Sequence, residues 1–405
     1  MPISITQALE IIYKNSAVVS SEILPIEMAL GRVMREDSIA TFDLPRFDNS
    51  AMDGYAVKCA DANTAVECTD VIYAGDEPTM TLKATKAIKI MTGAPIPDGC
   101  EAIIPVENVT VNDTQVILPE EIQKDGHIRR AGEDIKRGSV YLHKGEKITA
   151  YSIALLASQG VTHVRVTRKI KVAVFGTGDE LRPHFEKIAP HQLYNSNTPM
   201  FLARAKELGC EVQYIGSSGD TIESLTASIR SAINADIIIT SGGISMGDRD
   251  FTKDAFTNLG MELHFDKVDI KPGKPTAFGT IGKTVVINLP GNPLASMVNY
   301  EMFVRPAIRK MSGMNAYYHH TVSTQIKEDF KLRAGKHTVR LGVFDGNTFM
   351  PFTKQLPGMI SPLEQANAML ITTPDVSSLE KGKTVKILPI TWELTASEKE
   401  DFFTR

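Results

Sequence analysis

The 405-residue sequence is poor in cysteine, and its few cysteines form no recognisable site. Cys59, Cys68, Cys100 and Cys210 are scattered, no two of them form a Cys-x-x-Cys pair, and no histidine lies near them at a spacing that suits zinc. Free thiols of this kind fit the reducing environment of the cytosol. We therefore expect a cytoplasmic protein.

Long apolar runs and a strong excess of one charge are also missing. No apolar run approaches the roughly 20 residues that a membrane-spanning helix needs, and the amino terminus lacks a basic segment followed by an apolar one, so we expect neither a membrane anchor nor a signal peptide. A net charge of −4 argues against broad binding to nucleic acid or to an anionic membrane. Gly-x-Ser-x-Gly, Walker and His-Glu-x-x-His motifs are absent.

The length predicts several domains, because one hydrophobic core does not grow to this size. Helical spacing of apolar residues predicts helices in ITQALEIIYKNS, PIEMALGRVMRED and TAYSIALLASQG, the last capped by Thr149 and ended by Gly160. Short alternating runs between Gly, Pro, Asn and Asp predict a β-rich domain over residues 41–142. Residues 1–40 and 143–168 are grouped as a discontinuous helical or linking domain.

Buried strands alternate with helices over residues 169–315. KVAVF, DIIIT and TVVINL are typical of strands that are covered on both faces. The helices between them include TPMFLARAKELG, capped by Thr198, and DTIESLTASIRSAI, capped by Asp220, and Pro306 should kink the long helix LASMVNYEMFVRPAIRKMSG. This alternation predicts a central three-layer α/β domain with a mostly parallel sheet.

The carboxy-terminal part of the chain returns to β structure. HTVRLGVFDGNTFMPF predicts a hairpin that turns at Asp345-Gly346-Asn347, and MLITTP and KTVKILPI predict further strands. We expect a small β-barrel-like domain over residues 316–395, followed by a polar tail over residues 396–405.

Three central strands run into glycine-rich loops, GTGDEL, SGGISMGDRDF and PGNPLAS. Ligands of open α/β sheets bind beyond the carboxyl ends of the strands, where glycines let backbone N–H groups approach an anion and the next helix presents its positive end. A fourth loop, DKVDIKPGKPTAFG, is stiffened by proline and holds Lys267, Lys271 and Lys274. Its ammonium groups suit a phosphate or another oxyanion, although an exposed hairpin with solvated lysines is the simpler alternative.

Acidic residues lie in the same loops, Asp179 and Glu180 in the first and Asp248 and Asp250 in the second. Carboxylates repel a phosphate unless a hard cation lies between them, and Mg²⁺ takes one or two carboxylates together with phosphate oxygens. For each single aspartate the simpler interpretation is a helix cap. For Asp220 this interpretation weighs at least equally with metal or ligand binding. The residues alone therefore indicate a magnesium-dependent site for a phosphorylated small molecule.

Seven motifs, taken in order, carry a resemblance to a known family. FDNSAMDGYAV, IMTGAPIPDG, IRRAGEDI, GTGDEL, SGGISMGDRDFTK, IKPGKPTAFG and LPGNPLAS resemble the molybdopterin molybdenumtransferases, whose relatives include the carboxy-terminal domain of gephyrin. The resemblance spans residues from about 5 to 390. It implies a central domain of the molybdopterin-binding type. It also implies an activity, the insertion of molybdenum from molybdate into the dithiolene of adenylylated molybdopterin, with release of AMP and help from Mg²⁺.

The resemblance maps functional positions of the family onto this sequence. It implies catalytic roles for Asp53, Thr92, Asp134, Glu180, Asp220 and Asp250. It implies substrate binding by Ser241, Gly242, Gly243, Lys267, Lys271, Lys274, Pro290, Pro293, Arg340 and Ser361, with a looser match of the flanking residues at the last two. It implies Mg²⁺ binding by Asp179, Glu180 and Asp250. The lysines would hold either molybdate or the pterin phosphate, and the Ser-Gly-Gly loop would contact the pterin or its phosphate.

The resemblance further implies an elongated homodimer of four-domain subunits, with a site between the α/β domain of one subunit and the NSAMDGYA domain of the other. Asp53 would then belong to a loop that completes the site of a partner subunit. Molybdopterin adenylyltransferase and molybdoenzymes are candidate partners, whereas nucleic acid and membranes are not. Two alternative functions stay open at this point, adenylyl transfer from ATP to molybdopterin and a non-enzymatic dimeric scaffold. The extra domains argue against the first, and the acids in every site loop argue against the second.

Overall fold

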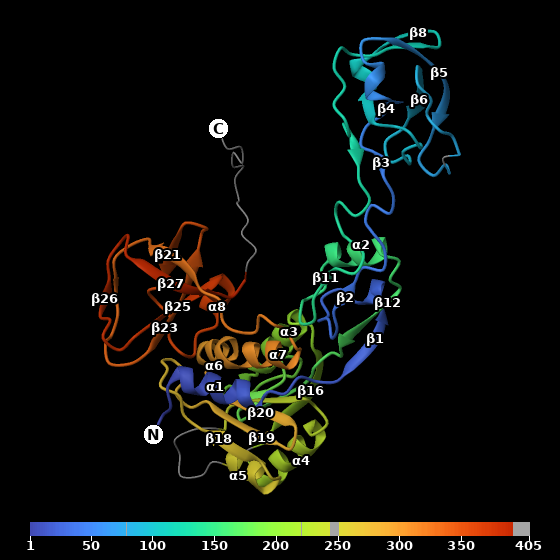
Figure 1. Ribbon diagram of the computed structural model, residues 1–405. Helices are drawn as coiled ribbons and strands as arrows, with labels where there is room; N and C mark the ends of the chain where they lie inside the picture. The colour runs from blue at the N-terminus through green and yellow to red at the C-terminus, as the bar shows by residue number, and fades with distance from the viewer. Residues whose placement is uncertain (78, 220, 244–250, 392–405) are drawn as a thin grey trace.

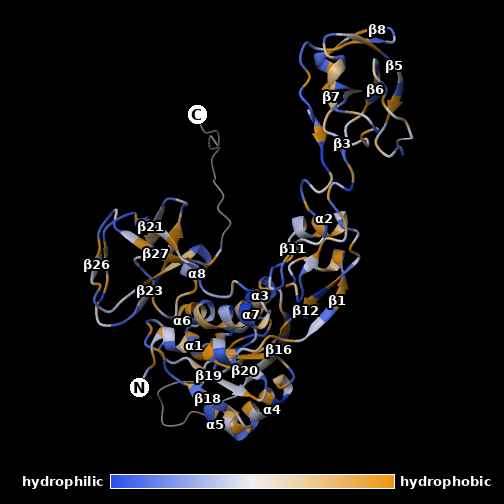
Figure 2. Cartoon of the chain, in the orientation of Figure 1, coloured by the Kyte–Doolittle hydropathy of each residue, from blue (hydrophilic) through white to orange (hydrophobic). Residues whose placement is uncertain are grey.

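The computed structural model describes residues 1–77, 79–219, 221–243 and 251–391. The chain is a bent, elongated molecule with a distal β unit at one end, a small linking unit, a central α/β unit and a β-barrel (Figure 1). Hydrophobic residues gather on the strands and on the covered helix faces of each unit (Figure 2). None of the helices in the described residues is long and apolar enough to cross a lipid bilayer.

The central unit is built on a six-stranded sheet with the order β16-β13-β17-β20-β19-β18. Its strands are β13 (Lys171–Thr177), β16 (Glu211–Ser218), β17 (Ile237–Ser241), β18 (Glu262–Phe265), β19 (Ala277–Ile281) and β20 (Thr284–Leu289). Strands β16, β13, β17 and β20 are parallel, and β19 runs antiparallel to both of its neighbours. The predicted mostly parallel sheet is confirmed, as are the buried strands KVAVF, DIIIT and TVVINL.

Helices cover both faces of the central sheet (Figure 1). They are α3 (Asn197–Glu207), α4 (Ile222–Ala232), α5 (Phe251–Asn258), α6 (Pro293–Asn299) and α7 (Arg305–Met311). Val172 and Val174 of β13 pack in one core with α3, α6 and α7, whereas Ala173 and Phe175 pack in a second core with α4 and α5. One strand supplies both cores because successive side chains of a strand point to opposite faces.

Two of the central helices start at other residues than the sequence predicts. The N-cap of α3 is Ser196, and the predicted cap Thr198 lies inside the first turn, where its N–H donates to the side chain of Asn195. The N-cap of α4 is Thr221, whose hydroxyl accepts a hydrogen bond from the N–H three residues later. The predicted cap, Asp220, lies outside the described residues.

The predicted long helix is interrupted just before its proline. Helix α6 passes into a π-helical segment, η4 (Tyr300–Val304), and then into α7, where Pro306 lies in the first turn. Proline lacks an N–H and clashes with the carbonyl four residues earlier, so a wider turn accommodates its ring. Within this segment Glu301 is 1% exposed and forms ion pairs with Arg204 at 2.6 Å and Arg305 at 2.7 Å.

The linking unit joins two distant parts of the sequence. Its elements are β1 (Ser21–Pro25), η1 (Ile26–Met28), β2 (Ser38–Ile39), β11 (Val140–Leu142), α2 (Ala150–Ser158) and β12 (His163–Thr167). Helix α2 starts at the predicted N-cap Thr149. The helix predicted for PIEMALGRVMRED is wrong, because only a single 3-10 turn forms there. Gly31 has a φ of +76°, which ends helical structure, and Met34 forms a β-bridge with Val166.

The amino-terminal helix α1 (Ile5–Asn15) packs on α7 of the central unit. Ala8 and Ile12 of this helix are fully buried in the core that holds α3, α6 and α7. Helix α1 lies within residues 1–40, which we expect to group with residues 143–168. The apolar face of α1 is covered by the central unit rather than by the linking unit.

The distal unit contains a six-stranded sheet with the order β7-β4-β6-β5-β9-β8, which confirms the predicted β structure. Its elements are β3 (Asn49–Ser50), β4 (Gly54–Val57), η2 (Cys59–Asp61), β5 (Ala65–Ile72), β6 (Lys86–Ile90), β7 (Ala102–Pro105), η3 (Val106–Asn108), β8 (Thr110–Asn112), β9 (Gln115–Ile117) and β10 (Ile128–Arg129). Strands β3 and β10 pair where the two connections leave the unit.

The carboxy-terminal unit is a closed barrel of five strands in the order β21-β24-β23-β25-β27. Its elements are β21 (Val322–Ile326), β22 (Phe330–Lys331), β23 (Thr338–Phe344), β24 (Thr348–Pro351), α8 (Ser361–Gln365), β25 (Ala368–Thr372), β26 (Ser378–Leu379) and β27 (Thr384–Pro389). The predicted hairpin is confirmed as β23 and β24. The Asp345 carboxylate fixes its turn by accepting the N–H groups of Asn347 and Thr348.

Candidate functional site

Two adjoining cavities lie between the ends of the central strands and the barrel. The first, of about 830 Å³, is called the basic cavity and is lined by Lys271, Lys274, Lys336, Arg340 and Lys354. The second, of about 810 Å³, is called the glycine cavity and is lined by Gly178, Gly242, Gly243 and Gly291. Pro275, Pro290 and Asn292 line both cavities, so they form a shared wall. All four loops singled out in the sequence contribute to this pair of cavities.

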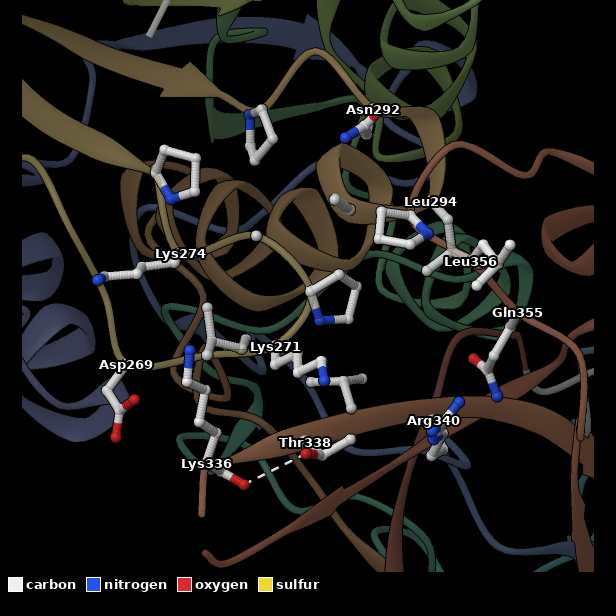
Figure 3. A pocket seen from close by; sticks show the side chains of 18 of the residues that line it. Asp269, Lys271, Lys274, Asn292, Leu294, Lys336, Thr338, Arg340, Gln355 and Leu356 are labelled. Atoms are coloured by element: carbon white, nitrogen blue, oxygen red, sulfur yellow. Dashed lines mark hydrogen bonds between the residues drawn. The ribbon is translucent and has the colours of Figure 1, made fainter. Parts of the chain in front are cut away.

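The basic cavity is lined by cationic side chains and by apolar ones such as Leu294 and Leu356 (Figure 3). Loop 269–275 forms one side, and strand β23 with the loop after β24 forms the other. The one carboxylate of the lining belongs to Asp269, which lies 3.1 Å from Nδ1 of His337. Lys271 and Lys274 share this lining with three cationic side chains of the barrel, and the excess of positive charge suits an anion.

Arg340 extends from β23 into the wall of the basic cavity. Its guanidinium carbon lies 5.7 Å from the centre of the Phe330 ring, and its Nε is buried with no hydrogen-bond partner in the described structure. Burial lowers the pKa of the Arg340 guanidinium, which nevertheless stays charged at neutral pH. A buried donor of this kind calls for an acceptor, and an oxyanion in the cavity would supply one.

The loop after β24 is pinned to β23 by Gln355. Oε1 of this side chain accepts the N–H of Leu341 at 2.9 Å. The same loop then crosses to the central unit, where the carbonyl of Pro357 accepts the N–H groups of Leu294 and Ala295 at 2.9 and 3.3 Å. The expectation that helix α6 presents free donors to a ligand is therefore wrong for these two groups, because the barrel loop already occupies them.

The turn after β17 requires glycine at two successive positions. Gly242 and Gly243 have φ values of +94° and +69°. A Cβ on Gly242 would lie 2.5 Å from the carbonyl oxygen of Thr177, and a Cβ on Gly243 would lie 2.1 Å from Oγ1 of Thr252. Both the backbone conformation and the close approach of neighbours exclude a side chain here.

The predicted magnesium ligands are only partly described. Glu180 lines the glycine cavity, whereas Asp179 is exposed and lies outside its lining. Asp250, like Asp220 and Asp248, lies outside the described residues. Within the described ranges, no group of three His, Cys, Asp or Glu side chains is arranged to hold a metal ion. The magnesium site thus stays a prediction.

The remaining predicted binding residues divide into two groups. Ser241, Pro290 and Pro293 line the glycine cavity, together with the two glycines that follow Ser241. Lys267 and Ser361 line neither cavity. Ser361 is exposed at the start of α8, just after two residues that do line the glycine cavity.

Three predicted residues lie away from both cavities, in the distal unit and its connections (Figure 1). The Asp53 carboxylate, in the turn between β3 and β4, accepts hydrogen bonds from the backbone N–H and the hydroxyl of Thr92, both at 2.7 Å. Both bonds lower the pKa of Asp53, and the bond from the backbone N–H has the larger effect. Asp134 is exposed between β10 and β11. One chain by itself therefore does not bring these residues to the cavities.

Several lining residues are missed by the sequence reasoning. Lys336 and Lys354 add positive charge to the basic cavity, and Tyr194 and Asn197 line the glycine cavity. Single lysines near strand ends carry no distinguishing pattern. The segment LYNSNTP did hold a signal, since Asn195 and Asn197 lie at the start of a helix that follows a glycine-rich loop, but the segment is interpreted first as a helix start.

The fold and the two cavities define a class of protein, an α/β ligand-binding unit embedded in a multidomain chain. Residues 173–310 match a family model described as "Probable molybdopterin binding domain". Residues 3–160 match a second model, described as "MoeA N-terminal region (domain I and II)".

Comparison with curated proteins and solved structures places the chain more narrowly. The molybdopterin molybdenumtransferase of Staphylococcus epidermidis is 32% identical over 402 residues, which cover 96% of this chain and 95% of that protein. The enzyme of the same name from Haemophilus influenzae is 34% identical over 382 residues, covering 91% and 94%. A crystal structure of a molybdopterin biosynthesis MoeA protein from Pyrococcus horikoshii superposes with a TM-score of 0.85 at 26% identity, covering 96% of this chain and 100% of that one. The chain belongs to the molybdopterin molybdenumtransferase family, as the seven motifs indicated.

Proposed function

We propose that the protein acts in molybdenum cofactor biosynthesis by inserting molybdenum, supplied as molybdate, into the dithiolene of adenylylated molybdopterin, with release of AMP. The observation that carries this proposal is the pair of adjoining cavities with different chemistry at the ends of the central strands. A shared wall between them holds two ligands next to each other, as a transfer between them requires. The names of the relatives support the same reaction.

Molybdate binds in the basic cavity in this proposal. Lys271, Lys274 and Arg340 supply charge-assisted hydrogen bonds to its oxygens, and the apolar side chains of the lining lower the local dielectric constant and so strengthen these bonds. No side chain forms a covalent bond, because the dithiolene sulfurs of the substrate take the metal. Asp179, Glu180 and Asp250 would supply carboxylates to Mg²⁺, which when bound would neutralise negative charge on the phosphate groups of the substrate.

The active form is a homodimer in this proposal, with each site completed by a second copy of the chain. The Asp53 loop of the distal unit lies apart from the cavities of its own chain (Figure 1). Its carboxylate is nevertheless fixed by two hydrogen bonds, and Phe47 and Met52 beside it are 49% and 39% exposed. A preorganised acid flanked by exposed apolar side chains suits a surface that a partner covers. A cytoplasmic location, and contact with molybdopterin adenylyltransferase and molybdoenzymes, belong to the same proposal.

The direct test measures AMP release by purified protein from adenylylated molybdopterin. Release should require both molybdate and Mg²⁺, and it should be lost in Lys271→Gln while circular dichroism stays unchanged. Consumption of ATP with molybdopterin, measured in parallel, would instead identify the protein as an adenylyltransferase. An intact protein that releases no AMP in the presence of both ions would overturn the proposal.

A further inference from the structure

A small cavity, called the joint cavity, lies where the linking unit meets the central unit. Its volume is about 130 Å³. Residues 31–33 and Lys147 of the linking unit line one side, and the carboxyl end of α7 and the turn between α3 and β16 line the other. Residues 167–170, which lead from β12 into β13, complete the lining. The joint cavity thus lies at the amino ends of β13 and β16, the opposite sheet edge from the basic and glycine cavities, and it shares no lining residue with either.

Cations outnumber anions in the described lining of the joint cavity. The cationic side chains are those of Arg32, Lys147, Arg168, Lys169 and Arg309. The one carboxylate is that of Glu207, which already pairs with Arg204 at 2.6 Å. Cys210 adds no negative charge, because burial raises the pKa of its thiol to about 12. The lining itself therefore supplies no free anion to neutralise these cations.

Two of the five cations are neutralised by carboxylates outside the cavity. Arg32 forms an ion pair with Glu22. The guanidinium of Arg168 donates two hydrogen bonds to the carboxylate of Asp236, at 2.6 and 2.7 Å. The positive charges of the other three cations are left over.

Arg309, on α7, is a half-buried cation whose guanidinium forms no hydrogen bond or ion pair with the described residues. Glu301 attracts it, but this carboxylate already pairs with Arg204 and Arg305, at 2.6 and 2.7 Å. Burial lowers the pKa of Arg309, which still stays charged at neutral pH. A partly buried donor of this kind calls for an acceptor, and an oxyanion in the joint cavity would supply one.

Lys147 and Lys169 line the joint cavity from different units, Lys147 from the linking unit and Lys169 from the segment that enters the central sheet. Both are exposed, and within the described ranges neither ammonium group forms an ion pair or a hydrogen bond. The carboxyl ends of α3 and α7 contribute partial negative charge, about half an elementary charge for each helix. About one unit of negative charge therefore faces three cations, and the remaining excess of positive charge suits an anion.

We propose that the joint cavity binds a tetrahedral oxyanion of the size of inorganic phosphate. Lys147 donates to it from the linking unit, and Lys169 and Arg309 donate from the central unit. The volume suits a small ion, because pockets that enclose a drug-sized ligand measure roughly 300 to 1,000 Å³. The bound ion ties the two units together, and since the linking unit carries the distal unit, it also steadies the distal unit (Figure 1). This inference does not rest on the proposed function, because the joint cavity takes part in no step of it.

The test measures phosphate binding to a full-length background protein that carries Lys271→Gln and Arg340→Met. These two substitutions weaken the basic cavity, which would otherwise bind phosphate as well. Titration calorimetry with inorganic phosphate at constant ionic strength should then show one site for each chain. Adding Lys147→Gln or Lys169→Gln should weaken phosphate binding about ten-fold, because each removes a charge-assisted hydrogen bond. Lys283→Gln is the matched control, since Lys283 is exposed between β19 and β20 and does not line the joint cavity.

Each outcome decides a part of the inference. Saturable binding that weakens in both lysine variants but not in Lys283→Gln supports a site shared by the two units. If the background protein does not bind phosphate, or if either Lys147→Gln or Lys169→Gln binds it as tightly as the control, the inference is overturned. Phenyl phosphate, titrated in the same way, identifies the source of the ligand. Equal affinity assigns the cavity to the phosphate group of a larger molecule, and much weaker binding assigns it to the free ion.

Discussion

At the scale of single residues, Arg340 has the clearest need for an anion. Its guanidinium is half-buried beside Phe330, and its Nε lacks a partner within the described residues. We expect Arg340→Met to weaken molybdate binding about ten-fold or more, because a charge-assisted hydrogen bond to an oxyanion is lost. Titration calorimetry with molybdate measures this effect.

The control for Arg340 is another arginine of the barrel. Arg333 is exposed and lines neither cavity, so Arg333→Met removes the same charge from the unit without touching the cavity. Equal losses of affinity in the two variants would mean that only the overall charge of the barrel matters. Arg340 would then have no direct contact with molybdate.

His319 is the residue for which a pH effect on stability is expected. Burial, opposed by its hydrogen bond to the carbonyl of Met302 and aided by Arg305 and Arg309, lowers the pKa of His319 from 6.5 to about 4. Below pH 6.5 the unfolded chain therefore binds a proton that the folded chain does not bind. The free energy of unfolding should not depend on this group above that pH, and it should fall by about 3 kcal/mol between pH 6.5 and 4.

Urea unfolding at several pH values measures this dependence. In His319→Gln the loss of stability between pH 6.5 and 4 should be smaller, because glutamine keeps a donor for the carbonyl of Met302 and does not titrate. His191→Gln, at an exposed position, serves as the control and should follow the wild-type curve. A wild type and a His319→Gln variant with parallel curves would show that His319 is protonated equally in both states.

At the scale of elements, strands were easier to predict than the segments that link them. KVAVF and TVVINL are apolar throughout because both faces of the central sheet are covered, so their sequence reports their burial directly. The helix predicted for PIEMALGRVMRED has suitable periodicity, but Gly31 and the pairing of Met34 with Val166 override it. The local sequence pattern of this segment carries no information about the strand with which it pairs. The pairing in the tertiary structure therefore overrides the local preference for a helix.

The residues of the candidate site also divide into those that the sequence predicts and those that it does not. Its glycine turns were predictable because a positive φ leaves a mark on the sequence, as at Gly242 and Gly243. Lys336 and Lys354 leave no such mark, because they reach the basic cavity only through the position of the barrel against the central unit. Asn197 reads as part of a helix start, and only its unpaired, buried oxygen distinguishes it.

The turn after β17 permits a test that separates backbone strain from steric overlap. Gly243 and Gly260 both have positive φ, +69° and +84°, but a Cβ would meet a neighbour only at Gly243. Gly260→Ala should cost about 1–2 kcal/mol of unfolding free energy, from strain alone. Gly243→Ala should cost about 1–3 kcal/mol more, because its Cβ would overlap with Oγ1 of Thr252. Urea or thermal unfolding measures both, and equal costs would mean that the turn can shift to admit a side chain.

At the scale of the whole molecule, the Asp53 loop and the two cavities lie in separate units of the chain. Long connections through the linking unit hold the distal sheet away from the central sheet (Figure 1). If Asp53 serves the cavities, it must therefore do so in another copy of the chain. A two-fold dimer would place one distal unit at each pair of cavities, so that every site contains residues of both chains.

Mixing two inactive variants tests this arrangement. Asp53→Ala and Lys271→Ala chains should each form dimers without AMP release, because every site then lacks one required group. After unfolding and refolding of an equal mixture, half of the dimers contain one chain of each kind, and one of the two sites in such a dimer is intact. We therefore expect AMP release to recover to about one quarter of the wild-type rate. A mixture that stays inactive although chains have exchanged would show that Asp53 and Lys271 act within the same chain, and sites shared between subunits would be ruled out.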